Sequence, residues 1–212
     1  MIYTSNYKNI DQEYMVDFTL SISGDKGKSE NPPYQGKCDT RFAPKKGFWR
    51  TWKDNIGNVD EEENNKFYIR HFYDEVLSGL DVDKEYRNLD EKILLCYEGP
   101  MDFCHRQIVA AWFELLLGVQ VPEIKQVGFD VLELPTNREW IKDYLEEYMK
   151  EKIDTIGFNS LHAFHLHEKA RKLEENATNN EDIRLALELR SYAYEEENRY
   201  LENKKGRSKK VD

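Results

Sequence analysis

The stretch KILLCYEGPMDFCHR, residues 92–106, decides the fold of this chain. Its first seven residues are almost all apolar, which is typical of a strand buried on both faces of a sheet. A Gly-Pro pair breaks that strand, and a helix is expected from 103 to 117. Asp102 is a plausible N-cap for the helix, and Gly118 is placed to end it.

The helix that follows this strand leads toward a further strand, expected at 119–121. A strand, a helix and a second strand in succession imply a parallel, right-handed crossover. The chain therefore predicts an α/β fold with a mainly parallel open sheet, flanking helices and a C-terminal helical hairpin extension. The other elements expected in the first 157 residues are strands at 2–5, 18–23 and 131–134 and helices at 60–80 and 138–152.

The 212 residues carry 31 basic and 41 acidic side chains, which gives a net charge of −10. Such a chain is not a basic coat for nucleic acid, although a local site for nucleic acid stays open. No apolar run is long enough to span a membrane, and no secretory signal is recognised at the start. Three cysteines do not make a disulfide scaffold. Composition therefore predicts a cytoplasmic globular protein without a membrane partner.

Three parts are expected along the chain. Residues 1–157 form the α/β domain, 158–203 form a helical hairpin extension, and 204–212 form a basic flexible tail. The hairpin consists of two helical stretches, 161–175 and 181–203, on either side of a short polar turn. It either packs on the α/β body or supports self-association, so a homo-oligomer formed through it is one expected assembly.

Ionisable side chains gather where the first strand ends and the next helix begins. In open parallel sheets, ligands bind beside the carboxyl ends of strands, and a helix N-terminus attracts anions. Cys104 is expected in the first helical turn, where the helix dipole, His105 and Arg106 favour its thiolate. Cys96 and Glu98 alternate onto one face of the strand and are therefore expected at the same crevice.

These side chains suggest specific roles. Cys104 is the candidate nucleophile, and His105 with Glu98 is a candidate general acid/base pair. The positive charge of Arg106 is unfavourable at a helix N-terminus, so a compensating interaction is expected. Arg106 is therefore predicted to bind an anion or a carboxylate. Cys96 is placed in the ligand-binding set. For both cysteines, packing in the core is the alternative.

No metal site and no particular cofactor is expected. Cys104 and His105 are consecutive on a predicted helix and should diverge, and the chain contains no C-x2-C pair. A reversible disulfide between Cys96 and Cys104 is geometrically conceivable, but a reducing compartment disfavours it.

Short polar residues follow the two strands expected near the N-terminus. If these strands run parallel to the strand at 92–98, all three strand ends converge on one pocket. The alternative is that the hydroxyl and amide groups only stabilise turns. The ligand-binding residues predicted from this convergence are Thr4, Ser5, Asn6, Tyr7, Ser21 and Ser23.

Residues 25–57 are expected to form a long ordered loop with short turns, a feature that is often functional. The loop contains FWRTWK, in which Trp49 and Trp52 lie on one side of a helical turn. These indoles are expected to stack on a flat ring, with Lys53 and Arg41 beside it for an anion. The alternative is that the indoles anchor the loop to the core.

The chain resembles the family called domain of unknown function 488 over roughly residues 1–125. The likeness rests on YTSNY near the N-terminus, the Ser-Ile-Ser strand, WRTWK, FYDEVLSGLD and above all LLCYEGPMDFCHR. The resemblance implies a compact α/β domain whose signature site contains Cys96, Cys104, His105 and Arg106. It implies no settled activity.

Taken together, the sequence predicts binding of a nucleotide-like or nucleic-acid-derived anionic ligand in a crevice at the strand ends. Hydrolysis or transfer of a glycosidic or phosphate-linked group is the reaction class expected if the protein is an enzyme. The alternative is a non-catalytic ligand-binding or protein-interaction module that assembles through the helical hairpin.

Overall fold

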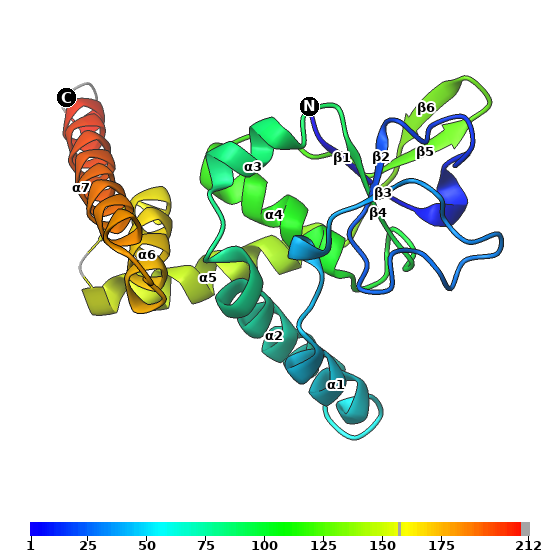
Figure 1. Cartoon of the computed structure of the whole chain (residues 1–212), viewed down its shortest axis with the longest axis horizontal. Helices are drawn as coiled ribbons and strands as arrows, with labels where there is room; N and C mark the ends of the chain where they lie inside the picture. Colours follow the sequence, from blue (N-terminus) through cyan, green and yellow to red (C-terminus); the bar gives the residue numbers. More distant parts are fainter. Residues whose placement is uncertain (157, 209–212) are drawn as a thin grey trace. The chain divides into compact units, whose positions relative to one another are not determined.

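The computed structural model describes residues 1–156 and 158–208, and its mixed α/β architecture confirms the predicted fold class (Figure 1). The strands are β1 (Tyr3–Asn6), β2 (Thr19–Ser21), β3 (Lys37–Cys38), β4 (Ile93–Cys96), β5 (Ile124–Val127) and β6 (Asp130–Glu133). The α-helices are α1 (Lys46–Asn55), α2 (Glu61–Phe72), α3 (Val82–Asn88), α4 (His105–Leu117), α5 (Arg138–Ile156), α6 (Leu161–Glu175) and α7 (Asn180–Ser208).

The chain folds as two compact units. The first consists of residues 1–77 and 82–145, and it contains the sheet, the hairpin β5–β6 and helices α1 to α4. The second consists of residues 78–81 together with the described residues from 146 onward, and it contains α6 and α7. Helix α5 starts in the first unit and ends in the second.

The main sheet has four strands in the order β1-β4-β2-β3, and every pairing within it is parallel. Strand β4 lies in the centre, and all four of its residues are buried, as its apolar sequence predicts. Because the strands are parallel, the carboxyl ends of β1, β2 and β4 lie at one edge of the sheet. The register places Asn6 beside Cys96 and Ser21 beside Leu95 at that edge.

Helix α4 follows β4 and packs against β1 and β4. Every residue from His105 to Phe113 is buried, so α4 forms the centre of this unit's core. Gly118 ends the helix as predicted, with a left-handed φ of 64° that glycine adopts without strain. Asp102 is not the N-cap. Its carboxylate accepts the N–H of Gly99 at 2.9 Å within the preceding turn, and Cys104 holds the cap position.

The strands expected after α4 are partly wrong. Residues 119–121 do not form a strand, and β5 pairs with β6 in an antiparallel hairpin. One parallel bridge, between Thr4 and Glu123, connects this segment to the outer side of β1. The chain after α4 therefore reaches β1 instead of extending the sheet beside β4, because β1 and β2 already occupy both edges of β4.

The segment 25–57 is more regular than a loop. It contains the edge strand β3, a short 3₁₀ turn at Thr40–Phe42 and the ten-residue helix α1. Phe48 is the buried residue of α1 and packs edge-on against Tyr68 and Phe72 of α2. The glycines and prolines of this segment led to the expectation of a loop. Helix α1 forms nevertheless, because the packing of Phe48 against α2 stabilises it.

The second unit contains the helical pair predicted from the sequence, with α6 and α7 packed against each other. The first helix has its predicted bounds, whereas α7 continues to Ser208 instead of ending at 203. The last four residues of the predicted basic tail lie outside the described residues. Among the helices of the described residues, none is both long enough and apolar enough to cross a membrane.

His165 is fully buried in this second unit, and its Nε2 donates a hydrogen bond to the carbonyl of Leu80 at 2.9 Å. Burial lowers the pKa of His165 from 6.5 to about 4. Between these two values the unfolded chain binds a proton that the folded chain does not. The free energy of unfolding therefore falls as the pH falls from 6.5 to about 4.

We predict that the protein loses about 3 kcal/mol of unfolding free energy through His165 between neutral pH and about pH 4. His165→Gln keeps an N–H donor for Leu80 without a titrating ring, so its stability should depend less steeply on pH. Urea denaturation followed by far-ultraviolet circular dichroism measures both proteins. Parallel pH profiles for the two proteins would contradict the prediction.

Candidate functional site

A cavity of about 790 Å³ opens in the first unit, at the carboxyl ends of β2 and β4 and beside the start of α1. Two chemically different walls enclose it. The first wall carries sulfur, imidazole and carboxyl groups, and the second carries indole rings and lysines. The residues that line the cavity are Ser23, Gly24, Asp25, Ser29, Thr40, Ala43, Pro44, Lys45, Lys46, Trp49, Trp52, Lys53, Tyr68, Cys96, Tyr97, Glu98, Phe103, Cys104 and His105.

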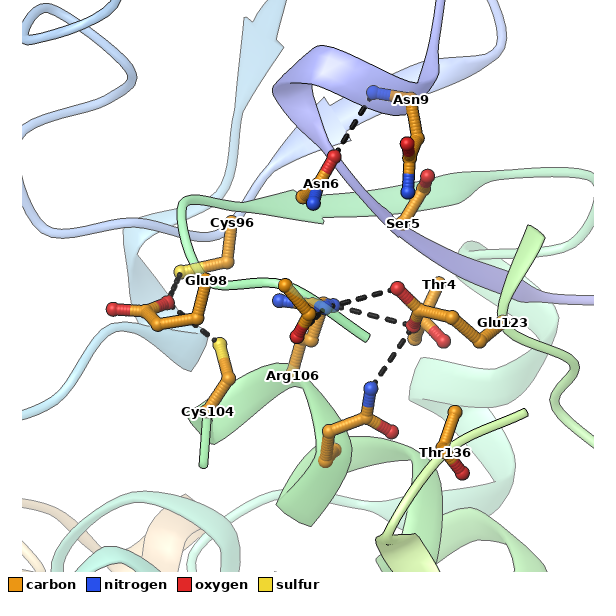
Figure 2. Close-up of polar contacts among 12 residues, drawn as sticks. Thr4, Ser5, Asn6, Asn9, Cys96, Glu98, Cys104, Arg106, Glu123 and Thr136 are labelled. Atoms are coloured by element: carbon orange, nitrogen blue, oxygen red, sulfur yellow. Dashed lines mark hydrogen bonds and ion pairs between the residues drawn. The ribbon is translucent and has the colours of Figure 1, made fainter. Parts of the chain in front are cut away.

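Cys96, Glu98, Cys104 and His105 meet at the first wall, as the sequence predicts. Oε2 of Glu98 lies 3.2 Å from Sγ of Cys96 and 2.9 Å from Sγ of Cys104. Figure 2 shows this carboxylate in contact with both sulfur atoms. Nδ1 of His105 lies 3.6 Å from the Cys96 sulfur and 4.0 Å from the Cys104 sulfur. These four side chains are called the thiol cluster below.

The expected divergence of Cys104 and His105 is wrong. Cys104 precedes the first helical residue and has an extended backbone, with φ −150° and ψ 143°. Its side chain therefore does not follow the helical 100° step that would separate it from its neighbour. The donor atoms of Cys96, Cys104 and His105 lie within 4.8 Å of one another, and all three residues are buried. These are the residues that could hold a metal ion.

A backbone carbonyl orients the imidazole of His105. Nε2 lies 3.0 Å from the carbonyl oxygen of Ile22, which follows β2. Because a carbonyl only accepts hydrogen bonds, Nε2 carries a proton. Nδ1 is the ring nitrogen that lies 3.6 Å and 4.0 Å from the two sulfur atoms. The Cys96 sulfur also lies 3.8 Å from Nε2, so it is near both ring nitrogens, and Nδ1 is the nitrogen that lies near both sulfur atoms.

The two thiols of the cluster differ in acidity. Burial raises the pKa of Cys96 well above its usual value. Burial also opposes ionisation of Cys104, but the hydrogen bond from Cys96 and the positive charges of Arg106 and His105 outweigh it and lower its pKa. Burial, together with the negative charge of Cys104, raises the pKa of Glu98 to about 7. Cys104 is therefore the more readily ionised sulfur, although it lies at the cap position and not in the first helical turn where the sequence placed it.

Arg106 lies beneath the cluster and does not line the cavity. Its side chain is fully buried, and its Nε and Nη2 donate to the two oxygens of Glu123 at 3.2 and 2.9 Å (Figure 2). Nη2 also donates to the carbonyl of Gly99 at 2.9 Å. Arg106 was expected to bind an anionic group of a ligand, but its guanidinium is paired with Glu123 of the same chain. A bound anion would therefore have to compete with that residue.

The second wall belongs to α1. Trp49 and Lys53 lie on this helix and line the cavity, and the ammonium of Lys53 lies 5.8 Å from the Trp49 ring centre. Trp49 is 40% exposed. Lys45 and Lys46 also line the cavity where α1 begins, and no side chain caps that helix. Free backbone N–H groups and three lysines therefore give this wall a positive potential.

Trp52 both anchors α1 and lines the cavity. Its N–H donates to Oδ1 of Asn65 at 3.0 Å, and its ring packs against Tyr68 and Phe103. These contacts anchor α1 to the core, which is the alternative weighed from the sequence. The same ring still lines the cavity, and Lys53 lies 5.0 Å above it.

Three of the predicted strand-end residues form one buried network. The hydroxyl of Tyr7 lies 2.6 Å from that of Ser21 and 3.0 Å from that of Ser23. Ser23 continues the network to the carboxylate of Asp25 at 3.0 Å and lines the cavity. Tyr7 and Ser21 do not line the cavity, and their hydroxyl groups are paired inside the fold.

The remaining predicted residues lie away from the cavity. Thr4 accepts a hydrogen bond from Arg138 at 3.0 Å, and Ser5 donates to the carbonyl of Ile124 at 2.6 Å. The side chain of Asn6 accepts the N–H of Asn9 and caps a 3₁₀ turn (Figure 2). These contacts follow from the position of β1, whose outer side pairs with the segment that leads to β5.

Arg41 also differs from its predicted role. Its guanidinium pairs with Asp39 at 2.6 Å and with Glu85 at 2.7 Å, and it does not line the cavity. Both carboxylates neutralise the charge that was expected to meet an anionic ligand.

Sequence reasoning missed part of the cavity wall. The carboxylate of Asp25 accepts a hydrogen bond from the hydroxyl of Tyr97 at 2.6 Å, and Phe103 packs against Trp52. Lys46 also escaped notice. Strand alternation gave no signal for Tyr97, because it places that side chain on the face opposite to Cys96 and Glu98. Strand β4 ends at Cys96, so the alternation no longer applies to Tyr97.

Comparisons with known proteins add no relative. No family model, no curated protein and no solved structure matches this chain. The resemblance to domain of unknown function 488 therefore stays a prediction, and the assignment of a function rests on the cavity itself.

We predict that Arg106→Met lowers the free energy of unfolding by about 3–5 kcal/mol, because it leaves the buried carboxylate of Glu123 without its counter-charge. Lys142→Met is the control, since it removes the partner of the exposed Glu139 across a distance of 3.9 Å and should change stability by less than about 0.5 kcal/mol. Urea denaturation measures both variants. Equal stabilities for the two would show that the buried pair is not needed by the fold.

Proposed function

We propose that this protein binds a small molecule with a flat ring and a negatively charged group, such as a nucleotide or a nucleic-acid fragment. The thiol cluster would then act on the bound molecule by hydrolysis or transfer of a glycosidic or phosphate-linked group. One observation carries the proposal: a single cavity has stacking and cationic groups on one wall and ionisable sulfur, imidazole and carboxyl groups on the other.

The size and lining of the cavity suit such a ligand. Its volume of about 790 Å³ lies within the range of about 300–1,000 Å³ that is usual for small-molecule sites. The partly exposed indole of Trp49 offers a face for a ring. Lys45, Lys46 and Lys53, together with the uncapped start of α1, favour a phosphate or carboxylate beside that ring.

The thiol cluster supports the chemical half of the proposal. It lies on the same cavity at the end of β4, so a ligand held by α1 would face it. Cys104, His105 and Glu98 are within hydrogen-bonding reach of one another through the sulfur atoms. Groups of this kind carry out proton transfer, nucleophilic attack or metal-assisted hydrolysis.

We predict that nucleoside monophosphates raise the melting temperature more than nucleosides or inorganic phosphate do, since only they engage both the indoles and the lysines. Trp49→Ala should weaken nucleotide binding roughly 5- to 150-fold, as expected for the loss of about 1–3 kcal/mol of stacking. Lys53→Gln should weaken the binding of the nucleotide but not of the nucleoside. Calorimetric titration measures each affinity.

Lys8→Gln is the matched control, because Lys8 is exposed and does not line the cavity. Cys104→Ala should retain nucleotide binding while any turnover of the bound compound disappears. Binding that is insensitive to both Trp49→Ala and Lys53→Gln would show that the ligand lies elsewhere, and the proposal would fail.

A second candidate function rests on α7. This helix exposes several large apolar side chains, and Ile183 and Leu187 lie one turn apart with exposed fractions of 43% and 54%. Apolar side chains at this spacing form a stripe that a second helix can cover. The helical pair is therefore proposed, as an alternative, to assemble the chain into a homo-oligomer without any chemistry.

If α7 mediates assembly, the full chain forms a homo-oligomer, and the double variant Ile183→Glu/Leu187→Glu is a monomer with unchanged helix content. Light scattering coupled to size-exclusion chromatography gives the mass. Arg184→Glu is the control, because it changes the charge of the same helix by the same two units at an exposed position, and it should leave the oligomer intact. A wild-type monomer at tens of micromolar would exclude this function.

A further inference from the structure

We infer that Cys96, Cys104 and His105 form a zinc site at the inner wall of the cavity. The inference deepens the proposed function, because it assigns a metal cofactor to the same thiol cluster. It contradicts the expectation from the sequence that no metal is bound. That expectation depended on a divergence of Cys104 and His105 that the extended backbone at Cys104 removes.

The donor spacing fits a tetrahedral ion. Zinc lies about 2.3 Å from thiolate sulfur and about 2.0–2.1 Å from imidazole nitrogen, so ligand atoms of the two kinds lie about 3.5 Å apart around it. Nδ1 of His105 lies 3.6 Å from the Cys96 sulfur and 4.0 Å from the Cys104 sulfur. The two distances from His105 are therefore close to the required value, and all three donor atoms lie within 4.8 Å of one another.

The surroundings of His105 support a ligand role. A metal-binding histidine usually donates its second N–H to a carbonyl or carboxylate, which fixes the ring and its tautomer. Here Nε2 makes that bond to the carbonyl of Ile22 at 3.0 Å, and Nδ1 lies near the sulfur atoms. The imidazole is buried, so its orientation is fixed by the fold.

The fourth coordination position of the zinc ion would open on the cavity. All three ligands and Glu98 line the cavity. The Glu98 carboxylate contacts both sulfur atoms (Figure 2). Three protein ligands with an accessible fourth position are typical of catalytic zinc sites, whereas structural sites use four protein ligands. Two thiolates and one imidazole also select zinc over magnesium or calcium, which prefer oxygen ligands.

The experiment measures metal in the purified full-length chain after dialysis against metal-free buffer. Plasma mass spectrometry should find about one zinc per chain, and cobalt added to the chelator-treated protein should produce thiolate-to-cobalt charge-transfer absorption. Cys104→Ser should weaken zinc binding by more than about 100-fold, beyond the about 10- to 100-fold cost of losing an outer-shell partner. Circular dichroism establishes that the variant is folded.

Cys38→Ser is the matched control, because Cys38 is an exposed cysteine on β3 that lies outside the cluster. It should retain full zinc content and the cobalt spectrum. If Cys104→Ser does not fold, His105→Gln replaces it, with the same loss of metal expected. A folded wild-type protein that takes up neither ion, or zinc retained by both folded ligand variants, overturns the inference.

The two proposals fail separately. If nucleotides bind the wild-type chain but neither metal does, the ligand site stands and the zinc site falls. If zinc binds through Cys104 and His105 but no nucleotide binds, the zinc site stands and the proposed ligand falls.

Discussion

The first unit depends on the ion pair between Arg106 and Glu123, both of which are fully buried. Removing two charges from water is costly, and only close, well-satisfied geometry compensates for it. Here both carboxylate oxygens accept hydrogen bonds from Arg106, and one also accepts from Gln107 at 3.0 Å. The pair therefore fixes the start of α4 against the segment that bridges to β1.

The candidate site follows from that constraint. Arg106 also donates to the carbonyl of Gly99, so the turn between β4 and α4 is tied to the helix that it precedes. This turn carries Glu98 at one end and Cys104 at the other. Its closure brings the two cysteines, eight residues apart in sequence, to the same carboxylate oxygen. The buried positive charge beneath them lowers the pKa of Cys104, together with the hydrogen bond from Cys96.

The same polar network continues through Gln107 to the start of α5. Arg138, at the start of α5, donates to Gln107, Glu114 and Thr4, and so joins α5, α4 and β1. Thr4 was expected to meet a ligand because it follows a strand. Its hydroxyl is instead part of the packing between elements. Hydroxyl groups at strand ends are ambiguous in this way, because the same atoms satisfy either a ligand or a neighbouring helix.

The sequence by itself determined the elements with strong local signals. The apolar run of β4, the glycine that ends α4 and the apolar periodicity of α2 each reflect a preference that acts within a few residues. The gathering of Cys96, Glu98 and Cys104 was also predictable, because a short turn joins the end of β4 to the start of α4.

Only the tertiary structure decided which polar groups face the cavity. Arg106, Arg41, Thr4 and Ser5 look like ligand-binding residues in the sequence, yet each is paired with a group that is distant along the chain. The convergence of Cys104 with His105 likewise depends on the extended backbone at the cap of α4. Local propensity does not encode such pairings, because a buried charge or hydroxyl takes whichever partner the packing of remote segments brings within reach.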